Sequence, residues 1–171
     1  NAKQKDISIK IDTALKEIEK KNTSLKGALP DNYFSRLNID NSKLAALLDI
    51  INNIDLISDK SKDVVGRVYE YFLKQFSITE KNMKGEFYTP KCLVNLIAEL
   101  IEPYQGIIYD PCCGTGGMFV QSMQFIEAHK GNKKNVAIYG QENISTTYKL
   151  ARMNLAVRGI LANLGDSAAD S

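Results

Sequence analysis

The sequence predicts an α/β protein in two parts, a helical N-terminal domain at residues 1–80 and a parallel-sheet domain at residues 81–171. Three observations predict this division. Before Lys81 apolar residues recur at helical spacing, and no segment there has a convincing strand pattern. After Lys81 short apolar runs alternate with amphipathic segments, which favours a parallel sheet covered on both faces. A glycine-rich turn also follows the first of those runs, where sheets of this kind bind ligands.

Three helices are expected in the N-terminal part, at residues 8–22, 42–54 and about 62–77. In each of them apolar side chains return every three or four residues among polar ones, as on a helix with one buried face. The segment around residues 27–32 contains glycine, proline and asparagine, and we interpret it as a connector.

The second part begins with a helix at residues 90–102, in which Thr89 is the expected N-cap and Pro90 takes the first helical position. The remaining elements are expected in the order strand 106–109, helix 116–130, strand 136–140, helix 144–158 and a short strand near 160–164. The two later helices each have one apolar face. We expect these faces to be formed by Phe119, Met123 and Ile126 in the first, and by Leu150, Met153 and Val157 in the second.

Composition excludes several kinds of site. The 171 residues carry a net charge of +2, so any nucleic-acid surface has to be a local patch. Cys112 and Cys113 are adjacent, and His129 is the only histidine, so we expect no metal centre. No apolar run reaches the ~18 residues of a membrane span. We therefore expect a cytoplasmic protein without membrane association.

Residues 110–117 read Asp-Pro-Cys-Cys-Gly-Thr-Gly-Gly, directly after the strand at 106–109. Glycines let the backbone approach a ligand, and the N-terminus of the following helix presents N–H donors. The turn lacks the Lys of a phosphate-binding loop. It also lacks the dinucleotide pattern, which needs a small residue where Phe119 stands. The pattern therefore predicts a small polar cofactor of another kind.

Acidic residues follow each of the three strands. Asp110 can accept from a cationic amino group, and Glu142 can accept from both hydroxyls of a ribose. Asp166 or Asp170 can accept from the amine of an adenine. An amine, a ribose and an adenine together describe S-adenosyl-L-methionine. Taken singly, Glu142 and the last acid are better explained as helix-capping or first-turn residues, but the three acids together with the glycine turn favour the cofactor.

Residues 85–90, 110–119 and 139–142 resemble the N6-adenine DNA methyltransferase subunits of type I restriction–modification systems. Residues 24–30 and 66–72 are similar to the helical N-terminal region of that subunit, so the resemblance covers nearly the whole chain. It implies a Rossmann-like methyltransferase domain that uses S-adenosyl-L-methionine. It also implies three partners, namely duplex DNA, a sequence-specificity subunit and a restriction subunit.

The resemblance also implies which residues bind the cofactor. These are Glu86, Phe87, Tyr88, Thr89, Pro90, Asp110, Pro111, Gly114, Thr115, Gly116, Gly117, Glu142 and Asp170. Thr89 would lie near the methionine carboxylate, Asp110 and the glycine turn would bind the methionine end, and Glu142 would bind the ribose. For the acid beside the adenine, Asp170 fits the family pattern better than Asp166.

Members of this family position the target amine with an Asn/Asp-Pro-Pro-aromatic motif, which accepts hydrogen bonds from the extruded base and stacks on it. The sequence has no doubled proline; its four prolines are Pro30, Pro90, Pro103 and Pro111. We therefore expect these residues to be a fragment that transfers no methyl group alone.

Two alternatives remain open at this stage. One is a methyltransferase that acts on RNA, protein or a free amine, and the other is a non-catalytic assembly module.

Overall fold

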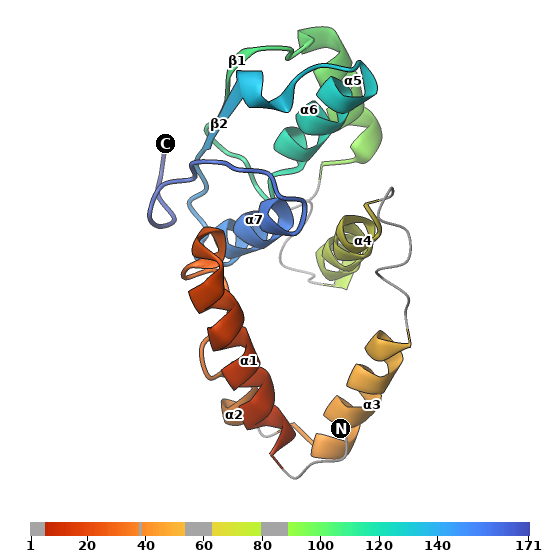
Figure 1. Cartoon of the computed structure of the whole chain (residues 1–171), viewed down its shortest axis with the longest axis vertical. Helices are drawn as coiled ribbons and strands as arrows, with labels where there is room; N and C mark the ends of the chain where they lie inside the picture. The colour runs from red at the N-terminus through yellow and green to blue at the C-terminus, as the bar shows by residue number, and fades with distance from the viewer. Residues whose placement is uncertain (1–5, 38, 54–62, 80–88) are drawn as a thin grey trace. The chain divides into compact units, whose positions relative to one another are not determined.

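A computed structural model describes residues 6–37, 39–53, 63–79 and 89–171 (Figure 1). The chain divides into two compact units, Asn1–Val64 and Val65–Ser171. Helix α4 (Val64–Thr79) therefore belongs almost wholly to the second unit. The domain boundary that the sequence predicts at residue 80 lies outside the described residues and stays a prediction.

The described part of the first unit is helical. It contains α1 (Ile7–Lys21), a 3₁₀ turn η1 (Thr23–Leu25), α2 (Tyr33–Arg36) and α3 (Asn41–Asn52). Helix α1 contacts both α2 and α3. The helices predicted at 8–22 and 42–54 are confirmed within their described residues. The short helix α2 was not predicted, because its sequence looks like the end of a connector.

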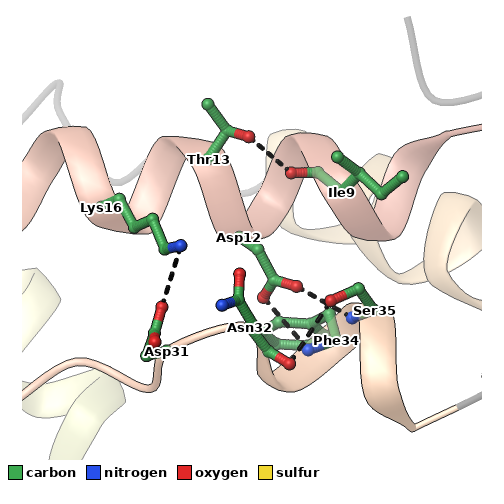
Figure 2. A network of polar contacts seen from close by, with 8 residues as sticks. All are labelled: Ile9, Asp12, Thr13, Lys16, Asp31, Asn32, Phe34 and Ser35. Carbon is green, nitrogen blue, oxygen red and sulfur yellow. Dashed lines mark hydrogen bonds and ion pairs between the residues drawn. The ribbon is translucent and has the colours of Figure 1, made fainter.

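Asp12 of α1 caps α2, although the two are far apart in the sequence (Figure 2). Its two carboxylate oxygens accept hydrogen bonds from the backbone N–H groups of Phe34 (3.1 Å) and Ser35 (2.9 Å). Asn32, the residue at the N-cap position of α2, makes no side-chain cap bond. The first N–H groups of a helix lack partners within the helix, so Asp12 supplies the acceptors that a four-residue helix cannot.

The second unit contains a β-α-β arrangement with further helices. Its elements after α4 are α5 (Lys91–Ile101), β1 (Gly106–Asp110), α6 (Gly117–Ala128), η2 (Lys133–Asn135), β2 (Val136–Gly140) and α7 (Ser145–Val157). Strands β1 and β2 are parallel, with Gly106 opposite Val136 and Asp110 opposite Gly140. The described residues thus form a mixed α/β unit with a two-stranded parallel sheet.

The short strand predicted near 160–164 is reduced to one isolated parallel bridge between Tyr139 and Asn163. The backbone of Asn163 donates to Ile138 and accepts from Gly140, at 2.9 and 3.0 Å. These bonds continue the parallel pairing beside β2, but the segment is too short to form a strand.

In the described part of the chain one face of the two-stranded sheet is exposed, and the predicted coverage of both faces stays a prediction. Ile108 and Ile138 point toward the core, whereas Tyr109 and Tyr139 alternate with them on the exposed face. Ile107, on that same face, keeps 72% of its surface exposed. Among the described residues the helices therefore cover the sheet on one side.

Helix α6 lies at the centre of the core. Phe119, Met123 and Ile126 are buried, as predicted for one face of this helix. The predicted face of α7 was wrong. Val157 is exposed, and the buried positions of α7 include Asn154 and Leu155 instead. A β-carbon at Gly140 would come within 2.8 Å of the Phe119 ring, so close packing of β2 against α6 requires glycine there.

Candidate functional site

The turn between β1 and α6 is hydrogen-bonded to the side chain of Asp110, the last residue of β1. Asp110 accepts a hydrogen bond from the backbone N–H of Cys112 at 3.0 Å. Gly114 and Gly116 both have positive φ, 54° and 79°, which few other residues adopt without strain. The N–H of Gly116 donates to the carbonyl of Cys113 at 2.8 Å. The glycines predicted to shape a ligand-binding turn therefore have the conformation that needs them.

Two backbone bonds connect this turn to the end of β2. The N–H of Cys113 donates to the carbonyl of Gln141 at 2.8 Å, and the N–H of Gln141 donates to the carbonyl of Asp110 at 2.9 Å. The carboxyl ends of both strands and the start of α6 therefore meet at one edge of the sheet. Ligands in parallel α/β sheets bind at this edge.

A hollow of about 120 Å³, partly open to solvent, lies at this edge. It is lined by Glu70, Leu73, Thr89, Lys91, Val94, Asp110, Cys112, Cys113, Gly114, Thr115, Gly117, Met118, Gln121 and Asn154. Five predicted cofactor residues are thus brought together: Thr89, Asp110, Gly114, Thr115 and Gly117. Pro90, Pro111 and Gly116 belong to the same two segments but are outside this lining. Glu86, Phe87 and Tyr88 lie outside the described residues.

The first turn of α5 begins one residue later than the sequence predicts. Pro90, and not Thr89, takes the N-cap position. The ψ angle of Pro90 is 133°, which is extended, so the helix starts at Lys91. The carbonyl of Pro90 accepts from the N–H groups of Leu93 and Val94. Thr89 is therefore not a helix cap, although it remains beside the hollow.

Glu142 lies at the end of the neighbouring strand but outside the lining of the hollow. It is 8% exposed, and one of its carboxylate oxygens accepts from the backbone N–H of Ile144 at 2.8 Å, just before α7. Its carbonyl accepts from the N–H of Ala169. Glu142 thus closes a turn ahead of α7, whose N-cap residue Ile144 has no side-chain cap bond. The second carboxylate oxygen still leaves acceptor capacity for a ligand.

Burial and the charges of Asp110 and Glu142 affect both thiols of the turn. Burial, followed by the charges of Asp110 and Glu142, raises the pKa of Cys113 to about 12. The pKa of Cys112 is also raised, chiefly by the charge of Asp110 and then by burial. Both carboxylates thus act on the same turn, and their negative charges favour a cationic ligand over an anionic one.

The last predicted acid remains undecided between two positions. Asp166 and Asp170 are both exposed. The backbone carbonyl of Asp170 accepts from the side-chain amide of Gln141 at 3.0 Å, so residue 170 lies beside the end of β2. The choice of Asp170 over Asp166 stays a prediction.

Four polar residues that line the hollow were not predicted from the sequence, namely Glu70, Lys91, Gln121 and Asn154. Lys91 lies in the first turn of α5, where the helix dipole disfavours a positive charge. That unfavourable position is the feature of the sequence that could have indicated a role for Lys91. Asn154 interrupts the apolar stretch of α7, and a buried polar residue of this kind needs a specific partner.

The described residues also set limits on other kinds of site. Among residues 6–37, 39–53, 63–79 and 89–171, no three His, Cys, Asp or Glu side chains are grouped as metal ligands. Within the same ranges, every helix is too short or too polar to cross a bilayer.

Comparison with known proteins adds an independent line of evidence. The family model described as N-6 DNA Methylase matches residues 60–171. The HindI methylase subunit of a type I restriction enzyme from Haemophilus influenzae is 44% identical over 170 residues, covering 94% of this chain and 38% of that protein. The MjaIX methylase subunit from Methanocaldococcus jannaschii is 37% identical, covering 87% of this chain and 27% of that protein. The chain thus spans well under half the length of these relatives.

Solved structures agree with this result. The chain is similar to a modification subunit assigned to a type I restriction enzyme from Vibrio vulnificus, with a TM-score of 0.56 and 29% identity over 71% of this chain and 26% of that one. A methyltransferase subunit of a type I restriction–modification system from Streptococcus thermophilus has a TM-score of 0.69 over 92% of this chain and 36% of that one. At 24% identity the latter supports the fold alone. Since the family model covers more than half of the residues, the chain belongs to the N-6 DNA Methylase family.

Proposed function

We propose that the protein of which this chain forms part is a site-specific DNA adenine-N6 methyltransferase, the methylation subunit of a type I restriction–modification system. Its second unit would be the first portion of a Rossmann-like methyltransferase domain. One observation carries the proposal: the Asp110 carboxylate and the glycine turn line one hollow at the carboxyl edge of parallel strands β1 and β2. The names of the related proteins support the same activity.

The residues around the hollow suit S-adenosyl-L-methionine. Asp110 would accept from the ammonium group. Thr89, Lys91 and the first N–H groups of α6 would bind the carboxylate, since a helix N-terminus favours an anion. Burial, and then the charges of Asp110 and Glu142, raise the pKa of Cys113, and the charges of these two carboxylates suit a ligand that carries positive charge.

The other end of the cofactor would be bound by residues next to the hollow. Glu142 would accept from the ribose hydroxyls, and Asp170 or Asp166 would accept from the adenine amine. Glu86, Phe87 and Tyr88 would complete the site from the preceding segment, as in the family motif.

Bound in this way, S-adenosyl-L-methionine supplies a methyl group on a cationic sulfur. The protein's task is to orient the acceptor nitrogen in line with that methyl group, and to exclude water around it. The Asn/Asp-Pro-Pro-aromatic motif that does so in the family is absent from these 171 residues. The proposed partners are duplex DNA with the target base extruded, a specificity subunit and a restriction subunit, in the cytoplasm.

The first test is calorimetric titration of the complete subunit with S-adenosyl-L-methionine. We expect saturable binding. Asp110→Asn should lose about tenfold or more in affinity, because a neutral amide cannot form an ion pair with the ammonium group of the cofactor. Asp31→Asn is the matched control, since Asp31 is an exposed acid in the first unit. An absence of heat at saturating cofactor would favour the assembly-module alternative.

The second test is transfer of radiolabelled methyl groups to duplex DNA. The complete subunit with its specificity partner should label adenine N6, whereas these 171 residues alone should give background counts. Labelling of RNA or protein in preference to DNA would favour the other methyltransferase alternative. Turnover by the 171 residues would show that the missing motif is not needed.

A further inference from the structure

A buried asparagine of α7 is hydrogen-bonded to the middle of the glycine turn. The Asn154 side chain is 2% exposed, and its Nδ2 donates to the backbone carbonyl of Thr115 at 2.7 Å. Thr115 stands between Gly114 and Gly116, the two residues with positive φ. Glycine allows this conformation but does not select it, because glycine has access to many others. A fixed donor on the intervening peptide can select it.

Arg158 determines which way the Asn154 amide faces. Its guanidinium donates to Oδ1 of Asn154 and, at 3.3 Å, to the backbone carbonyl of Asn154. A guanidinium has donors only, so it must face the oxygen of the amide. The nitrogen of Asn154 is therefore directed to Thr115.

Glu70 of α4 in turn determines the position of Arg158. Its Oε1 pairs with the guanidinium at 2.8 Å, and the Arg158 side chain is only 5% exposed. Removing the carboxylate partner of a buried guanidinium is strongly unfavourable, so the charge of Glu70 helps to keep Arg158 in this position. A continuous polar path thus connects α4 to the glycine turn.

We propose that Asn154 is a positioning residue that keeps the glycine turn in its ligand-binding conformation, and that Glu70 acts on the turn through Arg158 and Asn154. The inference rests on the proposed function, since it concerns the methionine end of the same cofactor site. It gives α4, a helix that precedes the family-like segment at residues 85–90, an indirect influence on cofactor affinity.

The test uses four variants of the complete subunit, with S-adenosyl-L-methionine as the titrated ligand. Asn154→Asp keeps the size of the side chain and its bond to Arg158, but it cannot donate to the Thr115 carbonyl. Glu70→Gln removes the charge of the pair, and the double variant combines both changes. Tyr69→Phe is the control, because it removes a different α4–α7 bond, from the Tyr69 hydroxyl to the Leu150 carbonyl at 2.9 Å.

We expect Asn154→Asp to weaken cofactor binding about tenfold, since it leaves a buried carbonyl without its donor. Glu70→Gln should also weaken binding in the wild-type background, but should have no further effect in the Asn154→Asp background. Tyr69→Phe should bind as the wild type does. Unchanged affinity in Asn154→Asp would overturn the proposal. A Glu70→Gln loss that persists in the double variant would also overturn it, because Glu70 would then act on the ligand directly from the hollow.

A second readout needs no cofactor. The Gly116 N–H donates to the Cys113 carbonyl within the turn, and its hydrogen exchange should accelerate about tenfold in Asn154→Asp. Exchange of the β2 amides, measured on the same sample, should remain at the wild-type rate and shows that the variant is folded. If the wild type binds no cofactor, the proposed function fails while the exchange result still decides the role of Asn154; unchanged Gly116 exchange rejects that role.

Discussion

The two units of the chain are stabilised in different ways. In the second unit, buried residues from position 98 to position 164 form one apolar cluster around Phe119. Among the described residues of the first unit, the buried apolar side chains are Ile7, Ala28 and Leu44. There a carboxylate, Asp12, joins α1 to α2 by accepting two backbone N–H groups.

This difference indicates where a precise site can be built. A packed apolar core deforms little, because its side chains interdigitate at high density. The glycine turn begins at a strand whose inner face belongs to that core, and it ends at α6. The first unit, in which a buried carboxylate joins α1 to α2, offers such a turn a weaker support. We therefore expect the two units to respond to different perturbations.

The largest expected effect is that of Phe119→Ala. Phe119 is fully buried against Gly140, so its removal leaves a cavity between α6 and β2. We expect the second unit to lose about 3–5 kcal/mol of unfolding free energy. Hydrogen exchange should show faster opening of α6 and β2 amides, and unchanged exchange in α1, because the core cluster is drawn from residues 98–164 only.

Ile107→Ala is the control for this prediction. Ile107 lies on the exposed face of β1, so the change should cost less than about 1 kcal/mol. Equal destabilisation by both substitutions would mean that the exposed face contributes to stability as the inner face does.

Local patterns predicted the elements of both units well. The bounds of β2 were predicted to the residue, and the glycine turn has the conformation its sequence requires. The pairing of adjacent strands brought Asp110 into a lined hollow at the predicted edge. These features depend on residues close together in the sequence, or on the fixed rule that parallel strands end at one edge.

Features that depend on distant partners were not predictable in this way. Helix α2 forms because Asp12, more than twenty residues away, caps it. The buried face of α7 was misjudged because Asn154 is polar; its burial is possible only through Thr115 and Arg158. Coverage of both faces of the sheet was inferred from apolar strands; the described helices cover the inner face, and coverage of the other face stays a prediction.

A smaller effect is expected for Asp12→Ala. The variant leaves the N–H groups of Phe34 and Ser35 without their acceptors, so α2 should separate from α1 more often. We expect protection of these two amides against hydrogen exchange to fall roughly tenfold, while α6 amides remain as in the wild type.

Asp31→Ala is the matched control for this prediction. Asp31 pairs with Lys16 in the same unit, at 3.1 Å, but both side chains are largely exposed. Exposed ion pairs contribute little, so protection of the Phe34 and Ser35 amides should change less than about threefold. A control effect as large as that of Asp12→Ala would mean that charge on this surface matters, and not the capping bonds.

The last expected effect is on the pH dependence of stability, which should have opposite directions in the two units. Burial alone would raise the pKa of Asp12, but the hydrogen bonds from Ser35 and Phe34 outweigh it and lower that pKa below 3.8. A lowered pKa means that the folded state binds the proton less readily than the unfolded state. The stabilisation from Asp12 is therefore complete above pH 3.8 and is lost as the pH falls through the folded-state value.

Cys113 has the opposite sign, because burial raises its pKa from 9.0 to about 12. The stabilisation from its neutral thiol is complete below pH 9.0 and is lost between pH 9.0 and about 12, where the unfolded chain ionises first. Hydrogen exchange as a function of pH, corrected for the intrinsic rate, should show α1 and α2 opening on the acid side and α6 opening on the alkaline side. Asp12→Asn should weaken the first dependence and Cys113→Ala the second. If either variant weakened both dependences, the two units would share one titrating group, and their stabilities would not be separate properties.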